Sequence, residues 1–344
     1  MRLLPLSLLL GALAPLGAAQ TTIHVPGDAP TIRDGLALAQ DGDTVLVAPG
    51  TYAEGELIFG GKAITLKSSG GPETTILDGQ FSSRLLRFWD GEGPDSVVEG
   101  FTFQNGRAPD STSDAFDQLD GGAIVMLIDE SPTIRECIFL GNRGGRGRSV
   151  SKADDGDPAD GAGDDGGNAD NGFQGGRGGR GGAIYVHDGQ PTIERCIFFD
   201  NRGGQGGTGG AGGDGAAGGP SGLFTGPGDG GDGGDGGVGG DGGQGGAIGI
   251  EFGSLAVVNC LFVENRSGGG GTGGIGGAQG AGGQSGLITQ DGDPGEPGRG
   301  GRGGDSGDGG TFWVGGEVLG PGAELGLINS SVTASLVGNG GLGG

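Results

Sequence analysis

Aromatic side chains and cysteine are both scarce in this sequence. Phe, Trp and Tyr together make up 5% of the 344 residues, too little to fill a conventional globular core of this length. The three Cys allow at most one disulfide with one thiol left over, which favours a ladder of small buried residues over a disulfide framework. Proline is also limited to 16 residues beside 95 Gly, and strict Gly-X-Y stretches are short, which excludes collagen.

Basic residues are few, and long apolar runs are almost absent. There are 19 Lys and Arg against 43 Asp and Glu, a net charge of −24. Such a balance argues against nucleic acid and anionic membrane surfaces as partners, and it suits a soluble exported surface. The one long apolar run, at 3–16, follows Arg2 and precedes Gly17-Ala18-Ala19. It predicts a signal peptide over 1–19, removed near Ala19, and no transmembrane segment.

One phrase, Gly-Gly-Ala-Ile, is repeated along the chain. It begins at 121, 181 and 245, and a variant, Gly-Gly-Thr-Phe, begins at 309, so the spacings are 60, 64 and 64 residues. A period of this length indicates stacked copies of one structural unit. We therefore predict a single domain over 20–344, interrupted by glycine-rich insertions at about 144–180, 203–244 and 267–308.

A second repeat lies between these phrases. The segment 132–143 matches 191–202 closely and 255–266 more loosely, and a degraded copy runs through 327–332. Strand periodicity cannot place its Ile, Cys and Phe on one face, so we expect a bend near Glu136. Stacking then forms ladders of like residues, with Cys137, Cys196 and Cys260 buried in one slot. Asn142, Asn201 and Asn265 either hydrogen-bond along the stack or tolerate a left-handed turn.

The first hundred residues of the mature chain alternate short strands with turns. A short amphipathic helix is expected over 31–40, with Ile32, Leu36 and Ala39 on one face. Strands are expected over 23–25, 44–48, 57–59, 63–67, 75–77, 85–88 and 97–103, and a turn over 49–52. The two His are His24, near the first strand, and His187, on one coil, where it has no partner constellation.

These patterns resemble the right-handed parallel β-helix proteins of the pectin-lyase-like class. The residues that carry the resemblance are the helix at 31–40, Gly42-Asp43-Thr44-Val45 and the later Gly-Gly-Ala-Ile coils. The resemblance implies an all-β solenoid with an N-terminal capping helix. It is weak for chemistry, because the paired Asp, Arg-Pro-Trp and Gly-His-Gly segments of the family's esterases and polygalacturonases are missing. Asp188, Glu194, Arg195 and Asp200 imitate the calcium and Arg-base set of a pectate lyase, as any charged coil would.

The glycine-rich insertions have a period of three. In 203–244, non-glycine residues recur every third position on both sides of a tip at 221–225, and 267–308 repeats this with a tip at 285–289. Three residues per turn is the polyproline II period, so each insertion predicts a hairpin of two extended arms. We expect an ordered bundle of such helices, the alternative being flexible loops. The 64-residue spacing places Asp235 opposite Arg299 and Asp241 opposite Asp305.

Asp residues recur along these arms, which raises the question of calcium. Three residues span about 9.3 Å, too far for one arm to chelate Ca²⁺, so only cross-arm sites remain possible. No catalytic, cofactor or metal residue is therefore assigned.

The sequence favours a non-catalytic exported protein, secreted or on the cell surface, with a structural, matrix or glycan-binding role and possible end-to-end or lateral self-association. The alternative is a carbohydrate-active enzyme, chiefly a polysaccharide lyase. The end of the chain, 337–341, is similar to the start of another insertion.

Overall fold

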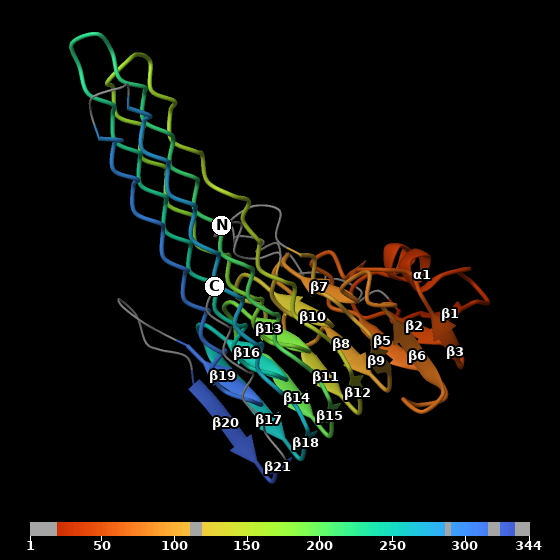
Figure 1. Ribbon diagram of the computed structural model, residues 1–344. Coiled ribbons are helices and arrows are strands. Elements are labelled where there is room, and N and C mark those ends of the chain that lie inside the picture. The colour runs from red at the N-terminus through yellow and green to blue at the C-terminus, as the bar shows by residue number, and fades with distance from the viewer. Residues whose placement is uncertain (1–18, 111–118, 286–289, 316–323, 334–344) are drawn as a thin grey trace, which may run out of the picture.

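The computed structural model describes residues 19–110, 119–285, 290–315 and 324–333. The expected signal peptide, most of the tip at 285–289 and the segment 337–341 therefore lie outside the described residues. Three parallel sheets wind into a right-handed β-helix, and glycine-rich arms project from its side (Figure 1). No described helix has the length and apolar character needed to cross a membrane.

The first sheet contains eight strands and begins at the N-terminus. A helix, α1 (Ile32–Leu38), contacts β1 and β2 and covers the N-terminal end of the stack. It is shorter than the predicted 31–40, although Ala39 beyond its end is buried as expected. In order, the strands are β1 (Thr22–Val25), β2 (Thr44–Val47), β5 (Thr65–Ser68), β8 (Val97–Glu99), β11 (Thr133–Arg135), β14 (Thr192–Glu194), β17 (Ser254–Val258) and β20 (Glu324–Ile328).

The second sheet follows the bend that the repeat predicted. Glu136, Arg195 and Asn259 adopt the left-handed conformation, with φ of 54°, 49° and 53°, just before its strands begin. Each bend changes the direction of the chain so that the Ile or Val two residues before it and the Phe after it both face the core. The strands are β3 (Gly50–Tyr52), β6 (Thr75–Asp78), β9 (Thr102–Gln104), β12 (Ile138–Leu140), β15 (Ile197–Phe199), β18 (Leu261–Val263) and β21 (Ser331–Thr333).

The third sheet is built from the Gly-Gly-Ala-Ile phrase and its relatives. Its strands are β4 (Leu57–Ile58), β7 (Leu86–Phe88), β10 (Ile124–Met126), β13 (Ile184–Val186), β16 (Ile248–Ile250) and β19 (Phe312–Val314). Two sequence expectations were wrong. The segment 49–52 contains strand β3 rather than only a turn, because its backbone pairs with β6. The segment 97–103 is two strands, because Gly100 at φ 80° bends the chain between them.

Ladders of identical side chains hold the coils in register. Phe103, Phe139, Phe198 and Phe262 are fully buried and stack with ring centroids 5.0, 4.6 and 4.6 Å apart. The three Cys are buried and unbridged in one slot, as predicted. Such stacks satisfy the core of each coil only through its neighbours, which makes the solenoid cooperative.

The Asn ladder is also confirmed. Asn142 Nδ2 and backbone N both donate to Asn201 Oδ1, at 2.9 and 3.0 Å, and Asn201 makes the same pair of bonds to Asn265. The left-handed residues are the ones before them, Gly141, Asp200 and Glu264. The role of these Asn is therefore hydrogen bonding along the stack.

The glycine-rich insertions form a two-layered bundle of six arms (Figure 1). We name the arms 1a (144–160), 1b (164–180), 2a (203–220), 2b (228–244), 3a (267–284) and 3b (292–308). One layer contains arms 1a, 2a and 3a, and the other contains arms 1b, 2b and 3b. Within a layer, the backbone N–H groups of one arm donate to the following arm at every third residue, as from Gly206 N on arm 2a to Gly269 O on arm 3a at 2.9 Å. Between layers, Gly237 N donates to Gly210 O at 2.8 Å. The arms lack internal hydrogen bonds, so this lattice supplies the partners that a lone arm would leave to water.

Candidate functional site

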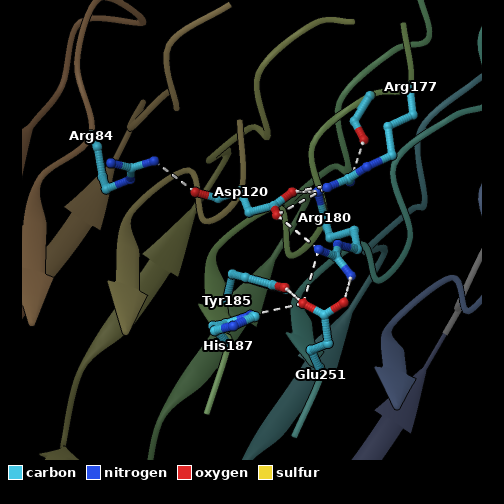
Figure 2. Close-up of polar contacts among 8 residues, drawn as sticks. Arg84, Asp120, Arg177, Arg180, Tyr185, His187 and Glu251 are labelled. Atoms are coloured by element: carbon cyan, nitrogen blue, oxygen red, sulfur yellow. Dashed lines mark hydrogen bonds and ion pairs between the residues drawn. The ribbon is translucent and has the colours of Figure 1, made fainter. Parts of the chain in front are cut away.

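A polar cluster lies where the arms meet the coils, directly beside the Gly-Gly-Ala-Ile phrase. It contains Arg180, Asp120, Glu251, Tyr185 and His187, and we call it the junction cluster (Figure 2). Arg180 ends arm 1b, whereas Glu251 follows β16 on the next coil. The cluster therefore ties the root of one hairpin to the coil that carries the next.

Arg180 is nearly buried, and its charge is matched on two sides. Its guanidinium binds both oxygens of Glu251, at 2.8 and 3.1 Å, and Oδ2 of the fully buried Asp120 at 3.3 Å. The rings of Tyr185 and Trp313 lie 4.7 and 5.0 Å from it. A cation enclosed in this way is stabilised only while its partners remain, because a buried charge without a partner is costly.

Glu251 is held in its ionised form. Burial opposes ionisation, but hydrogen bonds from Arg180 and Tyr185, together with His187, lower its pKa to about 2. Tyr185 Oη donates to Glu251 Oε2, and His187 Nδ1 lies 2.9 Å from the same oxygen. Burial raises the pKa of Tyr185 above its ordinary value. Glu251 is thus a weak base engaged by three neighbours, an arrangement that suits a structural lock better than proton transfer.

A buried carboxylate pair, Glu92 and Glu130, lies between two successive coils. Glu130 is fully buried and accepts hydrogen bonds from Gly91 N at 3.1 Å and Glu92 N at 2.7 Å. Glu92, also buried, accepts bonds from Gly61 N and Trp89 N. Burial, followed by the neighbouring Glu92, raises the pKa of Glu130 to about 7. The pair ties together the turns that follow the successive strands β7 and β10.

Of the four charged residues that imitate a lyase set, only Arg195 and Glu194 come together. Arg195 binds Glu136 and Glu194, at 3.0 Å each, while Asp200 binds Arg202 at 2.9 Å. Arg195 follows β14, Asp200 follows β15 and Asp188 follows β13, so each lies at a different corner of the coil. His187, expected to be a surface residue without partners, is half exposed but belongs to the junction cluster.

The outward carboxylates of arms 2b and 3b form an acidic face on the bundle. Arg299 N donates to Asp235 Oδ1 at 2.7 Å, and Asp305 N donates to Asp241 Oδ1 at 3.0 Å. The predicted register is confirmed, although the contact is to the backbone N–H rather than to the Arg side chain. These Asp side chains accept hydrogen bonds from the outward backbone N–H groups of arm 3b, for which no neighbouring arm supplies a carbonyl oxygen.

Cross-arm calcium sites stay a prediction. One oxygen of each of these Asp is already engaged by the bundle, and the described residues contain no group of three or more His, Cys, Asp or Glu disposed around a metal.

Sequence reasoning missed both buried clusters. Arg180 and Glu251 are 71 residues apart, and Glu92 and Glu130 are 38 apart, with no recurring motif to connect them. The one indication in the sequence was the position of these charged residues. Each lies at the end of an arm or just after a strand, next to residues that form the apolar core of a coil.

Comparison with known proteins gives distant likenesses. No family model and no curated protein matches the chain. Pectin methylesterase from carrot is 11% identical over 75% of each chain, with a TM-score of 0.27. A PL6 family alginate lyase mutant is 16% identical over 70% of this chain and 38% of its own, with a TM-score of 0.21.

A third solved structure is similar to part of the chain. It is the antifreeze protein of the springtail Granisotoma rainieri, described as a nine polyproline type II helical bundle, 28% identical over 44% of this chain and 94% of its own, with a TM-score of 0.11.

Proposed function

We propose that the protein is exported and acts by contact rather than by catalysis, as a structural or surface element that binds glycans or other surface components. The β-helix is the base, and the bundle is a rigid projection that carries the contact. Arms of 18 residues, such as 203–220, reach roughly 55 Å at the polyproline II rise. The signal peptide expected from the sequence supports export.

The observation that carries this proposal is the tip between arms 2a and 2b. Leu223 is 95% exposed and Phe224 fully exposed, although the turn around them is held by Gly222 N donating to Thr225 O at 3.1 Å. Thr225 Oγ also donates to Ala162 O of the neighbouring tip at 3.3 Å. A spacer gains nothing from two large apolar side chains in water, whereas a contact surface gains affinity from burying them.

The test compares binding before and after the tip is made polar. The whole mature protein is applied to a glycan array and to a panel of insoluble polysaccharides, beside a Leu223→Ser/Phe224→Ser variant. Val238→Ser, an outward apolar residue on arm 2b, is the matched control. We expect binding by the wild type and the control, and its loss in the tip variant. Equal binding by all three proteins would refute the contact role of the tip.

The alternative is a carbohydrate-active enzyme, chiefly a polysaccharide lyase. Its candidate residues are spread over three corners of a coil, which leaves no shared point for a substrate proton and a cation. The discriminating assay is the absorbance of unsaturated products on uronic-acid polymers, with and without Ca²⁺. Calcium-dependent turnover would replace our proposal with the lyase.

A further inference from the structure

Four arginines form a column along the β-helix. Arg107, Arg143, Arg202 and Arg266 pair one with the next in parallel register. The last three each follow a fully buried Asn of the ladder, so alternation turns their side chains away from the core. Adjacent strands lie about 4.8 Å apart, so the column presents one guanidinium for each coil. We call these four residues the arginine column.

Two of the four arginines in the column form ion pairs with carboxylates of the chain. Arg107 binds both oxygens of Asp110, at 2.7 and 2.8 Å, and Arg202 binds Asp200 at 2.9 Å. Arg143 and Arg266 have no carboxylate partner among the described residues. The guanidinium of Arg143 instead lies 4.7 Å from the ring of Phe81.

The two arginines without an ion pair are both partly desolvated. The Nε atom of Arg266 is buried and has no hydrogen-bond partner. Burial, followed by repulsion from Arg202, lowers the pKa of Arg143. Glu264 lies two residues before Arg266 in the sequence and makes no ion pair among the described residues. Arg143 and Arg266, which make no ion pair among the described residues, thus alternate along the column with the paired Arg107 and Arg202.

An apolar row lies on the outer face of the second sheet, one turn before the arginines. Three residues before each of the last three arginines, the outward positions of β12, β15 and β18 are Leu140, Phe199 and Val263. Leu140 and Phe199 are 37% and 39% exposed. An apolar row one turn before guanidinium groups matches a polymer whose backbone has apolar surface and whose anionic groups repeat once per coil. Arginine suits such groups because its fork binds oxyanions in pairs.

We propose that the arginine column binds a linear polyanion, with a carboxylate, sulfate or phosphate group about every 5 Å, laid along the β-helix axis. This goes beyond the proposed contact role of the tip, because it adds a second ligand surface, on the coils. The sequence already contained the signal, because Asn-Arg recurs at 142, 201 and 265. The net acidic charge of the whole chain argued against an anionic partner and so drew attention away from this repeat.

The experiment measures equilibrium binding of the mature protein to three probes, polygalacturonate, dextran sulfate and polyphosphate, with neutral dextran as the blank. We expect at least one polyanion to bind at low salt and to be released as salt rises. Arg143→Gln/Arg266→Gln should weaken this binding by about tenfold or more. Arg299→Gln/Arg302→Gln removes the same charge from the bundle and should change it less than about twofold.

Two further variants keep the outcome readable. Arg143→Lys/Arg266→Lys retains the charge, and it should bind more tightly than the Gln pair even if the Gln pair is less stable. Leu223→Ser/Phe224→Ser should bind the polyanion like the wild type, which separates this site from the tip. Binding of no polyanion, or equal losses in the column and bundle variants, would overturn the proposal. The probe that binds identifies the oxyanion.

Discussion

Replacing Gly237 with Ala tests the packing of the bundle at its centre. A Cβ atom at Gly237 lies 2.0 Å from Phe173 O and 2.6 Å from Phe173 C, both backbone atoms that no rotamer change moves away. To restore ordinary contact near 3.5 Å, arms 1b and 2b must separate by about 1.5 Å. That shift disrupts the bonds from Gly237 N to Gly210 O, from Gly210 N to Phe173 O and from Gly274 N to Gly237 O. At about 0.5–1.5 kcal/mol each, the bundle loses about 1.5–4.5 kcal/mol.

Gly226→Ala is the matched control, because a Cβ atom there has open space around it and meets nothing within 4 Å. It should be neutral or slightly stabilising. The assay is amide hydrogen exchange read by mass spectrometry. Gly237→Ala should lose protection in the arms while the coils keep theirs, since the coils retain their own ladders. Identical exchange in the two variants would refute the close packing of the arms.

Three other predictions concern the coils. Asn201→Ala removes the acceptor of Asn142 N and Nδ2 and the donor to Phe139 O, and it should lower the free energy of unfolding in denaturant titration by about 3 kcal/mol; an unchanged midpoint would contradict the ladder. Because Glu130 keeps its proton in the folded state up to a pKa of about 7, against an ordinary 4.5, melting temperature should fall as pH rises between these values, and Glu130→Gln should flatten that profile. Glu251→Gln removes a charge from beside Arg180 and should lower the melting temperature at pH 7, a loss that shrinks only as pH falls toward the Glu251 pKa of about 2.

The sequence was informative wherever one residue type recurs at one interval. The stacked Phe, the buried Cys and the bends at Glu136 and Arg195 follow from the repeat, because a repeated coil must place like residues on like. The extended conformation of the arms could be predicted because non-glycine residues recur at every third position. The register of Asp235 and Arg299 follows from equal spacing alone.

The sequence was uninformative where position depends on several segments at once. Strand β3 (Gly50–Tyr52) carries turn residues, and only its pairing with β6 makes it a strand. The order of arms within the two layers depends on backbone hydrogen bonds that glycine repeats leave unspecified. The junction cluster joins residues from an arm and from the next coil, and no local pattern marks such a meeting.

The central claim is that the glycine-rich arms form an ordered, packed bundle rather than flexible loops. Limited trypsin digestion of the native protein tests this claim most directly. Arg299 and Arg302 lie exposed on arm 3b, within sequence that a flexible loop would offer freely to the protease. The account predicts that both sites resist cleavage in the native protein and are cut promptly once it is denatured. Rapid native cleavage at Arg299 and Arg302 would contradict the bundle.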